Sequence, residues 1–157
     1  MCIGSDVQIQ KVNPSIEDAQ RLIAELDAYQ ATLYPPESNH LDGIVELASS
    51  NVTFVVAYRD GQAVGCGAVK AMAEGAYGEI KRLYVSPFAR GLGIAKAVMA
   101  ALESDMIARG INVTRLETGI HQEAALRLYG QLGYRRIGPF GAYREDPLSI
   151  FMEKQLS

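Results

Sequence analysis

Cysteine and histidine are scarce in this chain, which has two of each among its 157 residues. Two thiols, Cys2 and Cys66, do not form a disulfide framework and are typical of a reducing compartment. Cys66 lies in an apolar stretch between two glycines, so we expect a small buried packing residue rather than a nucleophile with a base beside it. The two histidines lack the spacing of metal ligands, and no metal cofactor is expected.

Long apolar runs and an excess of one charge are missing as well. No run approaches the roughly 18 residues that a membrane span needs, and the first six residues lack the parts of a signal peptide. The net charge of −3 comes from 15 basic and 18 acidic residues without a basic stripe. We therefore expect a cytoplasmic protein that binds neither membranes nor nucleic acid. Its length predicts one domain over residues 1–157.

The hydrophobic pattern predicts alternating strands and helices. Residues 52–58 and 62–72 are apolar strands, and Asp60-Gly61 between them favours a two-residue hairpin turn. Ser15 is expected to cap the first helix. Residues 77–85 form a strand that leads into a glycine-rich loop and a helix, and Gly110 follows that helix. The pattern predicts an α/β protein with a mixed sheet.

The glycine-rich loop, Arg90-Gly91-Leu92-Gly93-Ile94-Ala95, carries the strongest functional signal. Such a loop presents unpaired backbone N–H groups at a helix start, where the helix dipole also favours anions. The segment therefore predicts a phosphate-binding site. A P-loop is excluded because its Gly-Lys-Ser/Thr ending is absent. A dinucleotide fingerprint is disfavoured because Lys96 stands where a small residue is needed.

A second motif identifies the family that this loop resembles. The loop matches the R/Q-x-x-G-x-G/A signature of the GNAT superfamily of N-acetyltransferases, and residues 122–134 resemble the segment that ends GNAT domains. The resemblance extends over nearly the whole chain. It implies the GNAT fold, with a mixed central sheet of about six or seven strands and helices on both faces. It also implies acetyl-CoA as the acetyl donor.

A narrower resemblance, carried by Tyr34 to Ser38, Glu79 to Lys81, Leu116 to Gly119 and Pro139 to Pro147, is to a bacterial N-acetyltransferase subgroup. Some members of this subgroup have a suggested link to indole-3-acetate.

The resemblance implies a role for particular residues. The pantetheine arm would pair with the backbone edge of Leu83, Tyr84 and Val85. The pyrophosphate would lie on the backbone amides of Arg90, Gly91, Leu92, Gly93, Ile94 and Ala95. Gln122 stands where many relatives have an asparagine that contacts the cofactor.

Tyr129 would be the general acid that protonates the CoA thiolate, since a phenol with a pKa of about 10 carries its proton at neutral pH. The alternative is an aromatic side chain that only packs between helix and sheet. For the general base, Glu79 is the first candidate and Glu117 the second; either carboxylate could instead bind a cationic substrate. His121 is a possible proton relay. Four residues are candidates for acceptor selectivity: Glu37, His40, Tyr143 and Arg144.

The sequence thus predicts an acetyl-CoA-dependent N-acetyltransferase that acts on a small-molecule or amino-acid-like amine by direct transfer in a ternary complex. Two alternatives stay open. One is acetylation of a protein lysine or N-terminus, and the other is a non-catalytic module that only binds acyl-CoA. A homodimer is a further expectation from the resemblance.

Overall fold

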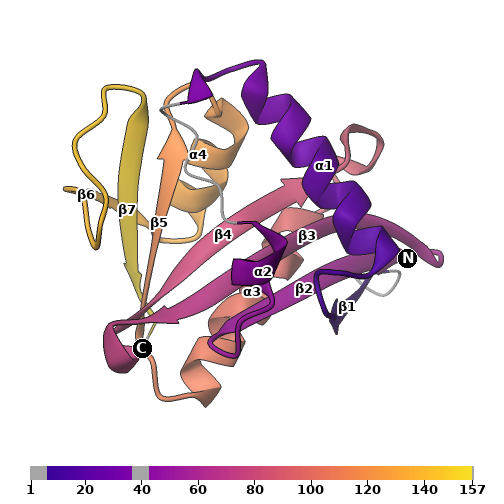
Figure 1. The fold of residues 1–157 in the computed structure, drawn as a ribbon, viewed down its shortest axis with the longest axis horizontal. Helices are drawn as coiled ribbons and strands as arrows, with labels where there is room; N and C mark the ends of the chain where they lie inside the picture. Colours follow the sequence, from indigo (N-terminus) through magenta and orange to yellow (C-terminus); the bar gives the residue numbers. More distant parts are fainter. Residues whose placement is uncertain (1–6, 37–42, 157) are drawn as a thin grey trace.

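The computed structural model describes residues 7–36 and 43–156. Within them, seven strands form one sheet in the order β1-β2-β3-β4-β5-β7-β6 (Figure 1). The strands are β1 Val7–Lys11, β2 Val52–Arg59, β3 Gln62–Met72, β4 Tyr77–Val85, β5 Val113–Gly119, β6 Arg135–Ile137 and β7 Ser149–Gln155. The helices are α1 Glu17–Ala31, α2 Ile44–Leu47, α3 Ile94–Ala108 and α4 Glu123–Gln131, with short 3-10 turns at Ala73–Gly75 and Pro87–Ala89.

Helices cover both faces of the sheet, as the resemblance predicted. In Figure 1, α1 and α2 lie in front of the sheet and α3 lies behind it. The front core packs α1 residues such as Leu22 and Leu26 against β2 and β3. The rear core joins α3, through Val98 and Leu102, to Tyr129 of α4. The predicted mixed sheet with helices on both faces is confirmed.

Two local predictions have opposite outcomes. Asp60 and Gly61 both have positive φ, 52° and 77°, and connect the β2–β3 hairpin as predicted. The prediction that Ser15 caps α1 is wrong. The helix begins at Glu17 after Ile16, with no side-chain cap. The Ser15 amide instead donates to Oδ1 of Asn13 at 2.9 Å, because the asparagine side chain satisfies that turn locally.

The sheet opens between β4 and β5, its parallel pair. The ladder joins only Gly78, Glu79 and Ile80 to Thr114, Arg115 and Leu116, although β4 continues to Val85. Arg82 has φ of 58°, and the β3–β4 register shifts beside it. A bulge of this kind bends the strand. Beyond Ile80, β4 therefore keeps its pairing with β3 and separates from β5.

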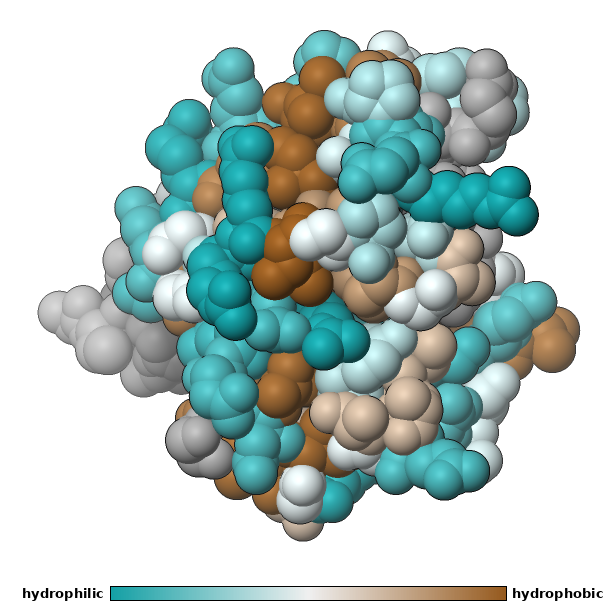
Figure 2. Space-filling model, turned by 90° about the vertical axis from the view of Figure 1, so that its left-hand side faces the viewer, coloured by the Kyte–Doolittle hydropathy of each residue, from teal (hydrophilic) through white to brown (hydrophobic). Residues whose placement is uncertain are grey.

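The β6 side of the sheet is an edge with polar protection. This strand has three residues, of which Arg135 and Arg136 are exposed. Arg135 donates to Glu153 of β7 at 3.0 Å. Figure 2 looks onto this side, where hydrophilic residues are interspersed with hydrophobic ones. A short, charged edge strand discourages pairing with the edge of another sheet.

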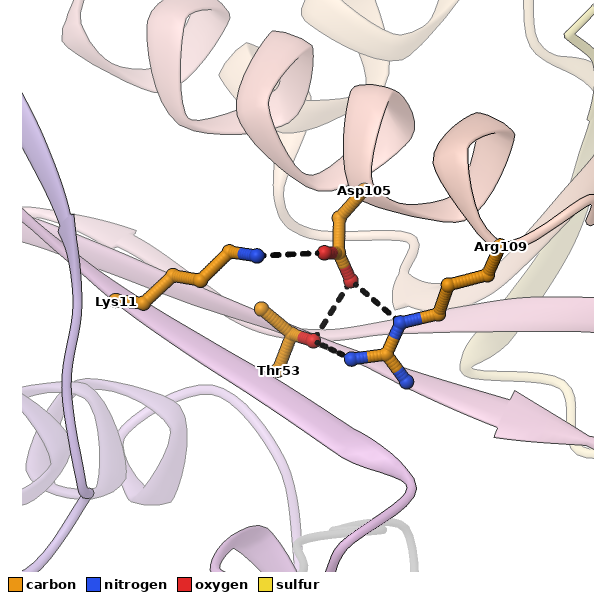
Figure 3. A network of polar contacts seen from close by, with 4 residues as sticks. All are labelled: Lys11, Thr53, Asp105 and Arg109. Atoms are coloured by element: carbon orange, nitrogen blue, oxygen red, sulfur yellow. Dashed lines mark hydrogen bonds and ion pairs between the residues drawn. The ribbon is translucent and has the colours of Figure 1, made fainter.

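A buried polar network holds the C-terminal half of α3 against the first two strands (Figure 3). Asp105 accepts hydrogen bonds from Lys11 of β1 at 2.8 Å and from the Thr53 hydroxyl of β2 at 2.7 Å. Arg109, one turn later, pairs with Asp105 at 3.2 Å and donates to Thr53 at 2.8 Å. Burial raises the pKa of Asp105, but the hydrogen bonds from Lys11 and Thr53 and the charge of Arg109 lower it overall.

Asp105→Asn is expected to lower stability by about 1–3 kcal/mol near neutral pH, because it leaves the buried Thr53 hydroxyl with a poorer acceptor and removes the charge that pairs with Lys11 and Arg109. A depressed folded-state pKa stabilises the fold above the unfolded carboxyl value of about 3.9, and this stabilisation is lost as the pH falls through the folded value. The difference in Tm between wild type and variant, followed from pH 7 downward, should therefore shrink below about pH 4. A difference that stays constant with pH would contradict this assignment.

Candidate active site

A cavity of about 450 Å³ lies where β4 has separated from β5. Five parts of the chain surround it: α1, the end of β4, the glycine-rich loop, the start of α3, and α4. Its lining residues are Leu26, Tyr29, Leu83, Tyr84, Val85, Ala89, Arg90, Gly91, Gly93, Ile94, Ala95, Lys96, Gln122, Glu123, Ala124, Ala125, Leu128 and Gln131. All the residues predicted to hold the cofactor line this cavity except Leu92, which packs against the rear core instead.

The glycine-rich loop has the backbone of an anion cradle. Gly91 and Gly93 have φ of 79° and 78°, a region that other residues rarely adopt. Gly93 directly precedes α3, which begins at Ile94. The first N–H groups of a helix lack intrahelical partners, and the helix dipole is positive at this end. The loop and the helix start can thus hold a phosphate-bearing group.

The side chain of Arg90 supports the loop. Its Nε donates to the backbone oxygen of Val85 at 3.3 Å, and its guanidinium lies 5.8 Å from the centre of the Tyr29 ring. Gln122, at the start of α4, also makes an internal contact, since its Oε1 accepts from the Gly119 amide at 3.1 Å. Both side chains therefore position backbone around the cavity.

Tyr129 belongs to α4, is absent from the cavity lining, and is 6% exposed. Its ring packs edge-on against Tyr134 with centroids 5.8 Å apart. Burial raises the pKa of Tyr129, and the charge of Glu117 raises it further. The phenol is therefore protonated at neutral pH and can act as a proton donor.

Glu79 is a buried carboxylate with two close partners. It is 3% exposed. The hydroxyl of Tyr143, from the segment between β6 and β7, donates to its Oε2 at 2.5 Å, and Lys81 Nζ lies 3.2 Å from the same oxygen. Arg115, which lies opposite Glu79 in the β4–β5 ladder, pairs with Glu153 of β7 at 2.8 Å. Glu79 thus connects β4 to the β6–β7 segment.

Glu117 lies half-buried near the end of β5 and accepts a hydrogen bond from Ser149 of β7 at 2.8 Å. Its charge raises the pKa of two tyrosines, Tyr129 and Tyr34, in which burial is the larger cause. Of the two candidate bases, Glu117 is the one that acts electrostatically on the candidate acid.

Tyr34 makes contacts with His121 that the sequence did not predict. It follows α1, is 7% exposed, and accepts a hydrogen bond from the His121 amide at 3.1 Å. Its ring stacks on the imidazole of His121 at 5.7 Å. Gly119 permits this contact, because a Cβ there would overlap the Tyr34 hydroxyl. The only available signal was the pair of prolines that directly follows Tyr34.

The remaining sequence candidates have simple outcomes. Cys66 is fully buried, and burial raises the pKa of its thiol to about 12, which confirms a packing role. Tyr143 and Arg144 lie between β6 and β7. Three candidates, Cys2, Glu37 and His40, lie outside the described residues.

Residues 7–36 and 43–156 contain no group of three metal-ligating side chains. The same ranges contain no helix long and apolar enough to cross a membrane.

Comparisons with known proteins agree with the fold. A sequence model of the acetyltransferase (GNAT) family matches residues 19–134. A protein of Azospirillum brasilense named IAA acetyltransferase is 44% identical over 151 residues, which is 96% of this chain and 99% of that protein. An uncharacterised N-acetyltransferase of Bacillus subtilis is 37% identical over 124 residues, 78% of this chain and 82% of the relative.

A solved structure shows the same fold over the same length. A Klebsiella pneumoniae protein described as an acyl-CoA N-acyltransferase superposes with a TM-score of 0.81 at 38% identity, covering 96% of this chain and 98% of the other. The N-acetyltransferase PaiA of Thermoplasma acidophilum, solved with coenzyme A, shares the fold with a TM-score of 0.73 at 24% identity, covering 95% of this chain and 98% of the other. Together with the glycine-rich loop and the opened β4–β5 pair, these similarities show that the chain belongs to the GNAT family of acetyltransferases.

Proposed function

We propose that this protein transfers the acetyl group of acetyl-CoA to the amine of a small molecule by direct attack in a ternary complex. One observation carries the proposal: the cavity is lined by both the glycine-rich loop and the open end of β4. The loop offers N–H groups to the diphosphate, and the edge of residues 83–85 offers backbone groups to the pantetheine amides. The CoA-bound relative and the Klebsiella acyl-CoA N-acyltransferase support this donor.

Three residues outside the cavity lining have distinct roles in this proposal. Acetyl-CoA supplies an acetyl thioester, whose carbonyl is attacked by the neutral amine. Tyr129, which is protonated at neutral pH, donates its proton to the departing thiolate. An aliphatic amine is mostly protonated at neutral pH, so a carboxylate that removes its proton directly or through water raises the rate. We assign this task to Glu117 ahead of Glu79, because Glu117 is partly exposed and its charge acts on Tyr129, whereas Glu79 is 3% exposed and pairs with Lys81.

Thiol release from acetyl-CoA, measured against amines, amino acids, polyamines, peptides and indole-3-acetate, tests the proposal. Turnover with one small-molecule class supports it. Turnover with peptides alone would favour the protein acetyltransferase, and CoA binding without any release would favour the acyl-CoA-binding module. Indole-3-acetate is included because the Azospirillum relative is named IAA acetyltransferase.

Glu117→Gln and Glu79→Gln are expected to separate the two carboxylates. The variant that lacks the general base, which we expect to be Glu117→Gln, should have a kcat about 10²-fold lower, the lower end of what general base catalysis contributes. Its pH–rate profile should also lose the decrease in rate at acidic pH that protonation of the base causes. Glu79→Gln should mainly lower the Tm, since it removes the charge of a buried carboxylate that pairs with the nearly buried Lys81 at 3.2 Å. The reverse pattern, with kcat lost only in Glu79→Gln, would return the role of base to Glu79.

The proposal also includes a single domain over residues 1–157, a cytoplasmic location, and a possible homodimer. The family match over residues 19–134 and the near full-length alignment with the Azospirillum protein support the single domain. Sedimentation at several protein concentrations measures the oligomeric state.

A further inference from the structure

A carboxylate on α1 contacts the cofactor strand from the side opposite α3. Glu25 is a residue of α1, the helix that crosses in front of β3 and β4 in Figure 1. Its Oε1 accepts hydrogen bonds from the Tyr84 hydroxyl at 3.0 Å and from the Ser86 hydroxyl at 3.1 Å. Its Oε2 accepts from Arg21 at 2.8 Å, and Arg21 in turn donates to the Ala63 oxygen at 2.8 Å. One side chain thus ties the helix to β4 and, through Arg21, to β3.

These contacts bracket the edge that faces the cavity. Tyr84 is a lining residue near the end of β4, and Ser86 is the fully buried residue between β4 and the 3-10 turn Pro87–Ala89. Val85 lies between them, lines the cavity, and accepts from Arg90 through its backbone oxygen. Glu25 therefore contacts the residues on both sides of Val85, and these contacts help to fix the position of the short backbone edge at the end of β4.

The same helix forms part of the cavity wall. Leu26, next to Glu25, and Tyr29, one turn later, both line the cavity. Tyr29 also lies against the guanidinium of Arg90 from the glycine-rich loop. A shift of α1 relative to β4 would therefore change the distance between the two cavity walls that these elements form.

We propose that Glu25 is a positioning residue for the acyl-CoA cofactor: by holding Tyr84 and Ser86 to α1, it sets the separation of the cavity walls before the cofactor binds. The proposal rests on the acetyl-CoA-dependent function inferred above. Preorganisation of this kind raises affinity by reducing the ordering that binding requires. Glu25 acts through other residues and does not touch the reacting atoms.

Glu25→Ala is expected to raise the Kd of coenzyme A, measured by calorimetry, by about tenfold, the equivalent of one lost charge-assisted hydrogen bond. Tyr84→Phe, which removes one of the two hydroxyl donors, should raise it less, and the combination should be less than additive because both changes break one contact. Glu25→Gln keeps an acceptor oxygen and should recover part of the affinity. The KM for acetyl-CoA should rise in parallel, with little change in the KM for the acceptor.

Two controls distinguish positioning from general stability. Asp105→Asn disturbs the network of Figure 3, whose residues are absent from the cavity lining, and should lower the Tm without changing the Kd of coenzyme A. Glu17→Gln, at an exposed position on α1, should change neither. A Glu25→Ala variant with a lower Tm and an unchanged Kd would overturn the proposal. Wild-type protein that binds no coenzyme A would instead refute the proposed function.

Discussion

Tyr129→Phe should lower kcat by about 10²-fold while the protein still binds coenzyme A, since general acid catalysis typically contributes 10²- to 10⁴-fold. The substitution removes one oxygen and leaves the ring in the rear core, beside Tyr134. Burial and the charge of Glu117 both keep the phenol protonated, so the wild-type hydroxyl has a proton to donate across the physiological pH range. The measurement is thiol release at saturating acetyl-CoA and acceptor.

Tyr134→Phe is the matched control for this result. The Tyr134 hydroxyl lies 2.7 Å from Thr114 and 2.9 Å from Glu103, so its role is structural. Its removal should lower the Tm, because it leaves the buried Thr114 hydroxyl without this partner, and should leave kcat within a few-fold. Equal kcat in wild type and Tyr129→Phe would assign Tyr129 to packing alone.

Gly93→Val should raise the Kd of coenzyme A by at least about tenfold. A β-branched residue is strained at a φ of 78°, at a cost of roughly 1–2 kcal/mol. The loop relieves that strain by moving the N–H groups that precede Ile94 away from the diphosphate. Each hydrogen bond to a charged group is worth about 1.5–3 kcal/mol, so one misplaced donor accounts for a factor of ten. Calorimetric titration with coenzyme A gives the constant directly.

Gly61→Val provides the comparison. Gly61 has a similar φ of 77°, but it lies in the β2–β3 hairpin and is absent from the cavity lining. Both variants should lose similar stability, while only Gly93→Val should lose affinity. If the two variants bind coenzyme A equally well, the glycine-rich loop is a turn without a role in phosphate binding.

Local patterns predicted the parts of the site that follow each other along the chain. The loop from Arg90 to Ala95 could be recognised because a strand, two glycines and a helix start are adjacent in sequence. The hairpin at Asp60-Gly61 was equally accessible, since its turn residues have a strong conformational preference. The backbone edge of Leu83, Tyr84 and Val85 was inferred through the family resemblance rather than from any residue pattern.

The contacts missed by the sequence join residues far apart in the chain. Glu25 bonds to Tyr84 and Ser86 across about sixty positions, and Tyr34 meets His121 across 87. Neither pair has a periodic signature, because hydrogen-bond partners in different elements depend on the packing of the whole sheet. Ser15 shows the same limit at short range. A serine side chain is well suited to cap a helix, but the side chain of Asn13, two residues earlier, forms the hydrogen bond in this turn instead.

The short parallel ladder has a consequence for how the molecule can move. Three residue pairs connect β4 to β5, whereas the strands on either side pair along most of their lengths. The sheet therefore consists of two parts, β1 to β4 and β5 to β7, that only a short ladder connects. The candidate cofactor cavity lies where these two parts separate. A molecule bound there would contact both β4, from the first part, and α4, which follows β5 of the second part. It would therefore restrain the motion of one part relative to the other.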